Sequence, residues 1–97
     1  MSDWVRVATF EADDDAVATI VKEISSSEGP PPGIGGKSIM VLADRENGRA
    51  RIVVRFDSEE NLRTGSATLD AMEPPAEARM RRLSVEKFEV VLERTAP

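Results

Sequence analysis

Lys37–Phe56, KSIMVLADRENGRARIVVRF, decides the fold, because its pattern predicts a β-hairpin. Apolar side chains recur at every second position on both sides of Asn47 and Gly48, the only Asn-Gly pair in the sequence. Asn and Gly tolerate the positive φ that tight hairpin turns demand, and charged residues flank the pair. We therefore expect two antiparallel strands joined at this pair.

The residues before the hairpin predict a strand and then a helix. Asp3–Glu11 alternates as a strand with apolar groups on both faces. Asp13, Asp14 and Asp15 follow, where the unpaired N–H groups and the dipole of a helix start favour acids. We expect Asp13 or Asp14 to cap the helix and do not expect a metal cluster. The apolar stripe of this helix is Val17, Ile20, Val21 and Ile24, and the helix should stop near Ser27.

Glu28–Gly36, EGPPPGIGG, is the longest irregular segment. Its prolines resist helix and strand, whereas its glycines permit unusual φ. The sequence GGKS at its end is similar to part of a phosphate-binding loop, but Pro31 stands where the first glycine belongs, and the loop leads from a helix into a strand. We expect no nucleotide site there. The loop either gates the space between helices and sheet or only crosses between elements.

After the hairpin, Asp57–Met72 predicts a second helix and Leu83–Arg94 a last strand. Gly65 and Ser66 lie in the middle of the apolar face of this helix, where small residues allow a close approach to a sheet. The connection Glu73–Arg82 is long enough for one more helical turn.

The order strand, helix, strand, strand, helix, strand predicts one α+β domain over residues 1–97 with a ferredoxin-like βαββαβ fold. In this fold both helices cover one face of a four-stranded antiparallel sheet. The residues expected on that covered face are Val5, Val7, Ile39, Val41, Ile52, Val54, Phe56, Phe88, Val90 and Leu92. Those expected on the other face are Trp4, Arg6, Phe10, Met40, Leu42, Arg51, Val53, Arg55, Lys87, Glu89 and Val91. So many large apolar groups indicate an interface, so we expect a homodimer in which two sheets pack into an α/β barrel.

Composition excludes several partners. The chain has 97 residues, 32% of them charged, and a net charge of −5, which disfavours nucleic acid because phosphate binding needs a basic stripe. The one basic cluster, Arg79, Arg81 and Arg82, is either a solvated segment or an anion contact. No apolar run approaches the roughly 20 residues that span a bilayer, and the N-terminus does not look like a signal peptide. We expect a cytoplasmic protein that contacts no membrane.

Several short motifs carry a family resemblance. They are Pro32-Gly33 with Gly36, Asp44-Arg45 with Gly48-Arg49, Phe56-Asp57-Ser58-Glu59-Glu60, Ser84-Val85-Glu86 and Glu89-Val90-Val91. On these the chain resembles the dimeric α/β-barrel superfamily and, within it, small proteins similar to antibiotic biosynthesis monooxygenases. The resemblance implies the fold and a dimer more than a chemistry.

Departures from that family concern its catalytic groups. Haem-degrading members use a histidine ligand, and this sequence has no His. The cofactor-independent oxygenases look to be served by a Trp, an Asn and an Arg. In this sequence only Trp4 is available as the Trp, and only Asn47 and Asn61 as the Asn. Asn47 is used by the hairpin turn. Asn61 falls in the first turn of a helix, where it either caps the helix, is solvated or contacts a ligand. Without His, Cys or Tyr, acid–base chemistry would need a buried Asp, Glu or Lys. We expect no haem, metal or other cofactor.

Three functional hypotheses remain open. The first is a homodimeric binding or accessory module for a small aromatic or anionic ligand, with aromatics as an apolar wall and arginines on an oxygen. Its candidate residues are Trp4, Arg6, Phe10, Met40 and Arg55, with Asn61 in addition; the alternative for them is interface packing. The second is a cofactor-free oxygenase for an aromatic or polyketide-like substrate. The third is a structural protein whose only partner is itself.

Overall fold

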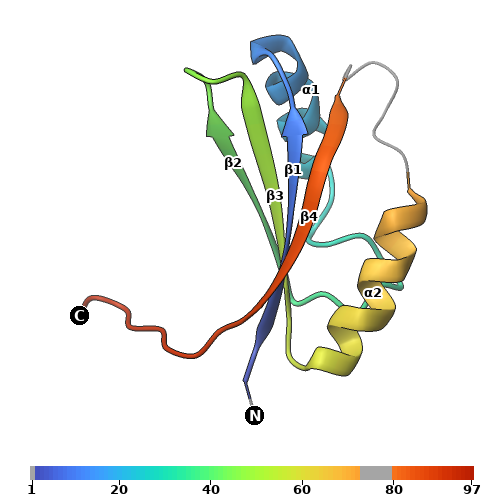
Figure 1. Ribbon diagram of the computed structural model, residues 1–97, viewed down its shortest axis with the longest axis vertical. Coiled ribbons are helices and arrows are strands. Elements are labelled where there is room, and N and C mark those ends of the chain that lie inside the picture. Colours follow the sequence, from blue (N-terminus) through green and yellow to red (C-terminus); the bar gives the residue numbers. More distant parts are fainter. Residues whose placement is uncertain (1, 73–79) are drawn as a thin grey trace.

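The structure is a computed structural model that describes residues 2–72 and 80–97. Its elements are β1 (Trp4–Glu11), α1 (Asp14–Ser25), β2 (Ser38–Asp44), β3 (Arg49–Phe56), α2 (Glu59–Ala71) and β4 (Arg81–Glu89). The strands form one antiparallel sheet in the order β2-β3-β1-β4, and the helices lie on one side of it (Figure 1). The predicted ferredoxin-like fold is confirmed. The expected extra helical turn and Arg79 lie in the part outside the described residues.

The central hairpin has the predicted strands and turn. β2 and β3 pair from Ser38 opposite Arg55 to Asp44 opposite Arg49. Gly48 has a φ of 65°, a conformation that favours glycine. The Asn47 side-chain amide donates to the Asp44 carboxylate at 2.9 Å, and this bond lowers the pKa of Asp44. Asn47 is therefore held by the turn, as predicted.

Both helices begin with a side-chain cap. The Asp13 carboxylate accepts from the Ala16 N–H at 2.8 Å, and the Ser58 hydroxyl accepts from the Asn61 N–H at 3.1 Å. Each cap satisfies one N–H group that has no partner within its helix. The predicted cap at Asp13 is confirmed. No helix within residues 2–72 and 80–97 is long and apolar enough to cross a membrane.

The structure corrects the prediction of which β1 side chains face the helices. Arg6 lies opposite Val54 and Ala8 opposite Ile52, so the even-numbered residues of β1 share the face that packs on the helices. We call it the helix face, and the other the open face. Val5 and Val7, which were predicted to be covered by helices, belong to the open face. The prediction was wrong because it sorted residues by polarity, and the one charged residue of the strand interior is buried.

The face assignment of β4 is also a correction. Phe88 lies opposite Val5 on the open face, where it is 48% exposed. β4 ends at Glu89, so Val90 and Leu92 lie beyond the strand and belong to neither face. For β2 and β3 the predicted faces are right. The open face therefore carries the apolar residues Val5, Val7, Met40, Leu42, Val53 and Phe88.

The buried residues form two clusters under different helices. One cluster joins α1 to the hairpin end of the sheet and contains Ala12, Ala16, Val17 and Ala50. The other lies under α2 and contains Ile34, Val54, Phe56 and Leu62. Ile34 is only 3% exposed although it comes from the proline-rich and glycine-rich loop. That loop is thus anchored in the core.

Gly65 sets the distance between α2 and the sheet. A Cβ atom at this position would lie 2.5 Å from the Ile34 carbonyl oxygen and 2.5 Å from Cε1 of Phe56. The prediction that small residues allow a close approach of this helix is confirmed.

We predict that Gly65→Ala destabilises the protein. Overpacking costs about 1–3 kcal/mol, and the better helix propensity of alanine returns only about 1 kcal/mol. Because both contacts of the added Cβ would be only 2.5 Å, we expect the upper part of that cost, about 2–3 kcal/mol, and urea unfolding should show a net loss of about 1–2 kcal/mol in the free energy of unfolding. Gly29→Ala is the control, because a Cβ there meets nothing within 4 Å. Equal stability of the Gly65 variant and wild type would contradict the close approach.

Candidate functional site

A cavity of about 400 Å³ lies between the two helices and the helix face of the sheet. Most of its wall is apolar and comes from the sheet and both helices. Representative wall residues are Phe10, Ile20, Ile24, Ile52, Val54 and Leu69. Three charged residues also line it, namely Arg6 from β1, Glu23 from α1 and Arg82 from β4.

Arg6 lies on the sheet side of this cavity and is held by α2. Its side chain is 4% exposed. Nε donates to Ser66 Oγ at 3.1 Å and Nη2 donates to Asp70 Oδ1 at 2.7 Å. Ser66 and Asp70 are four residues apart in sequence, so they are neighbours on one side of α2. The hydrogen bond from Arg6 lowers the pKa of Asp70, which keeps the partner carboxylate charged.

The third nitrogen of the Arg6 guanidinium, Nη1, makes no hydrogen bond to any described residue. Every fully buried side-chain nitrogen and oxygen of the described residues has a hydrogen-bond partner. Since Arg6 lines the cavity, Nη1 belongs to a guanidinium at the cavity wall and has no hydrogen-bond partner among the described residues. A guanidinium N–H pair in an apolar space can donate to an oxygen of a ligand.

Arg82 stands where α2, β4 and the cavity meet. It donates to the carbonyl oxygens of Leu69 at 3.4 Å and Asp70 at 3.0 Å. These carbonyls belong to the last turn of α2, which has no basic residue of its own. Arg82 thus places a positive charge at the negative end of the helix and donates to the Asp70 carbonyl, whereas the Leu69 carbonyl also accepts from the Met72 N–H at 3.1 Å.

The structure places the residues that the sequence suggested as ligand contacts on two different faces of the sheet. Arg6 and Phe10 line the cavity, and Trp4 shares the helix face with them but packs against the core under α2. Met40 and Arg55 lie on the open face. The expectation that all five border one space is wrong, because β1 has the opposite phase to the one predicted.

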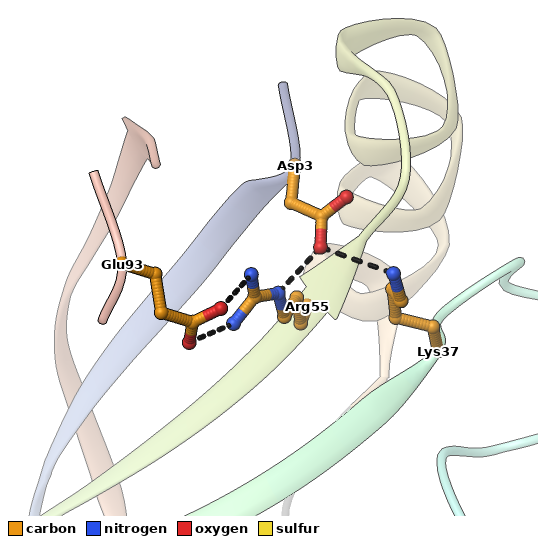
Figure 2. Close-up of polar contacts among 4 residues, drawn as sticks. All are labelled: Asp3, Lys37, Arg55 and Glu93. Carbon is orange, nitrogen blue, oxygen red and sulfur yellow. Dashed lines mark hydrogen bonds and ion pairs between the residues drawn. The ribbon is translucent and has the colours of Figure 1, made fainter. Parts of the chain in front are cut away.

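Arg55 is occupied by carboxylates at the end of the sheet (Figure 2). Its Nε donates to Asp3 at 2.6 Å, and its two terminal nitrogens donate to Glu93 at 2.8 and 2.9 Å. Asp3 also accepts from Lys37 at 3.1 Å. These contacts raise the pKa of Arg55, chiefly through Glu93, and lower the pKa of Glu93 and Asp3. The cluster ties both chain ends to the sheet.

Asn61 is exposed and does not line the cavity; its backbone N–H takes part in the cap of α2. A role for it in ligand binding stays a prediction. The loop Glu28–Gly36 has two parts: Gly29 and Pro31 border the cavity, whereas Ile34 is buried in the core. The structure therefore supports a bracing role for the second part and leaves gating by the first part a prediction.

Sequence reasoning missed the roles of Ser66, Asp70 and Arg82. Their contacts with Arg6 and α2 join segments that are far apart in the chain, and no local pattern signals them. Ile34 did leave a signal, as the one large apolar residue in its loop. Within the described ranges no group of three His, Cys, Asp or Glu side chains could hold a metal ion.

Solved structures share the whole fold with this chain. A candidate antibiotic biosynthesis monooxygenase from Bacillus cereus is 17% identical, with a TM-score of 0.67 over 100% of this chain and 99% of that one. A candidate antibiotic biosynthesis monooxygenase from Chloroflexus aurantiacus J-10-fl is 16% identical, with a TM-score of 0.57 over 97% and 98% of the two chains. No family model and no curated protein sequence matches. The likeness confirms the resemblance in fold, and at these identities it shows the fold alone.

We predict that Asp70→Asn lowers stability at neutral pH and that this difference fades in acid. Asp70 is about half exposed, so solvent screens the pair and we expect a loss of about 1–3 kcal/mol, less than for a fully buried pair. The pKa of Asp70 is depressed from 3.8, so its contribution is complete above 3.8 and is lost as pH falls through the lower folded-state value. Melting temperatures of both proteins between pH 7 and pH 2 test this. Asp57→Asn is the control, because Asp57 forms no ion pair with the described residues. A pH-independent gap would contradict the ion pair.

Proposed function

We propose that this protein is a homodimeric module that binds a small, mostly apolar ligand in the cavity between its helices and sheet. The observation that carries the proposal is the Arg6 guanidinium at the wall of a mostly apolar cavity, where its Nη1 has no hydrogen-bond partner among the described residues. A ligand oxygen would accept from it, and the apolar wall would hold the body of the ligand. This deepens the binding hypothesis from the sequence and relocates it from the open face of the sheet to a cavity on the helix face.

A cofactor-free oxygenase is the second candidate, and the description of the two fold neighbours favours it. Neither Trp4 nor Asn61 lines the cavity. Glu23 is the one carboxylate among the described lining residues, so a general base in this cavity would have to be Glu23. Oxygen uptake with an aromatic polyketide, compared in wild type and Glu23→Gln, tests this reading.

The open face supports the homodimer. Met40 is 52% exposed, Leu42 45% and Phe88 48%, and they share this face with Val5, Val7 and Val53. Contiguous apolar surface of this kind marks an interface, and a second copy offers the same apolar face to it. Trp4 and Phe10, which were expected on this face, are not part of it. We keep the cytoplasm as the proposed location, which cell fractionation tests.

We predict that naphthol, an aromatic ring with one hydroxyl, binds in this cavity. Titration followed by amide NMR shifts should perturb residues around Ala8, Ile24 and Leu69. Ala8→Leu grows a side chain into the cavity and should abolish these shifts, and Ile24→Trp provides a second blocked variant if the first is unstable. Val21→Ala is the control and should bind as wild type does, because Val21 is exposed on α1 and lines neither the cavity nor the open face. Unchanged binding in folded blocked variants would contradict the proposed site.

We predict that the wild type sediments as a dimer at micromolar concentration and that Met40→Asp converts it to a folded monomer. A charge buried without a partner in the sheet-to-sheet interface would cost several kcal/mol. Val53→Asp should have the same effect. Val21→Asp is the matched control, because Val21 is 45% exposed on α1, away from the open face. A monomeric wild type, or an equal effect of the Val21 change, would refute this interface.

A further inference from the structure

The charges at the cavity are distributed unevenly. Arg6 and Arg82 line the side formed by β1, β4 and α2, whereas Glu23 lines the side formed by α1. Lys87 lies directly opposite Arg6 on the neighbouring strand and therefore on the same face of the sheet. One side of the space is thus basic and the other carries a single acid.

The basic side has more positive than negative charge. Asp70 is the carboxylate paired with Arg6, and Arg82 is bound to backbone carbonyls, which are dipoles and not full charges. Arg6, Arg82 and Lys87 all act on the carboxylate of Asp70, and Glu89 lies on the same face of β4 as Lys87, so among the described residues three cations stand against two carboxylates. Their remaining charge is available to an incoming group.

We infer that the ligand is an amphipathic anion, with an apolar body in the cavity and one carboxylate or similar oxyanion at the junction of α2 and β4. This inference rests on the proposed function and adds the charge and the orientation of the ligand. Nη1 of Arg6 supplies hydrogen-bond donors from the floor, and Arg82 supplies a guanidinium at the rim. Charge-assisted hydrogen bonds to a carboxylate are stronger than those to a neutral hydroxyl. Glu23 repels the same group from the α1 side, which favours the orientation with the charged end of the ligand at the junction of α2 and β4.

Naphthoate and naphthol form a matched pair of probes, because they share one ring system. At pH 7 naphthoate carries a charged carboxylate, whereas naphthol carries a neutral hydroxyl. Calorimetric or NMR titration should give tighter binding of naphthoate to the wild type. Arg82→Gln should weaken naphthoate about 3- to 10-fold and leave naphthol within about twofold. Glu23→Gln should leave naphthoate binding unchanged or tighten it.

Two further variants separate recognition from structure. Arg82 also caps α2, so Lys87→Met serves as the second variant: it removes a charge without touching the cap and should weaken naphthoate selectively. Arg45→Gln is the matched control, since it makes the same substitution at the hairpin tip, where the side chain is 61% exposed. Raising the salt concentration should weaken naphthoate more than naphthol, because ions screen the exposed charges at the rim.

The outcomes distinguish the two proposals. If naphthol binds and naphthoate binds no better, or if Arg45→Gln weakens naphthoate as much as Arg82→Gln does, the anion inference is overturned while the cavity remains a binding site. If neither probe perturbs the cavity residues, both proposals fail together. Selective loss of naphthoate in Arg82→Gln and Lys87→Met supports the inference.

Discussion

A guanidinium buried between a sheet and a helix is the constraint on which the rest of this structure depends. Charge taken out of water must be paired and hydrogen-bonded, or the cost reaches several kcal/mol. Arg6 meets that requirement only when Ser66 and Asp70 of α2 lie over β1. The position of α2 along the sheet is thereby fixed. Gly65, next to Ser66, then has to be glycine because the helix approaches Phe56 and the Ile34 carbonyl too closely for a Cβ atom.

The cavity follows from how the two helices share the sheet. α1 and α2 lie over different parts of the helix face (Figure 1), and each has its own buried cluster. Between the two clusters the helices do not pack directly against the sheet. The space left there is lined by side chains such as Ala8 and Ile52. The same arginine that positions α2 also lines this space, and its Nη1 has no hydrogen-bond partner among the described residues. Structural pairing and ligand recognition would then use different nitrogens of one side chain.

The sequence predicted a structural feature correctly wherever the residues that determine it are neighbours in the chain. The Asn47-Gly48 turn, the Asp13 cap and the small residues around Gly65 were all predicted and are present. The phase of β1 was not, because Arg6 is buried by partners 60 and 64 residues away, and polarity alone places an arginine in water. The phase of β4 failed with it, because Phe88 lies opposite Val5 and shares its face, and Val90 and Leu92 lie beyond the end of the strand.

The central claim is that Arg6 is buried at the cavity wall, with two nitrogens held by α2 and the third able to donate to a ligand. Arginine side-chain NMR tests it most directly, because the Nε–H of each arginine exchanges with water at a rate set by its hydrogen bonding and burial. The account predicts that the Arg6 Nε–H, assigned by its loss in Arg6→Lys, exchanges far more slowly than that of exposed Arg63. It also predicts that Ser66→Ala accelerates this exchange and that naphthol shifts the resonance. Exchange of Arg6 as fast as that of Arg63, with no response to naphthol, would contradict the account.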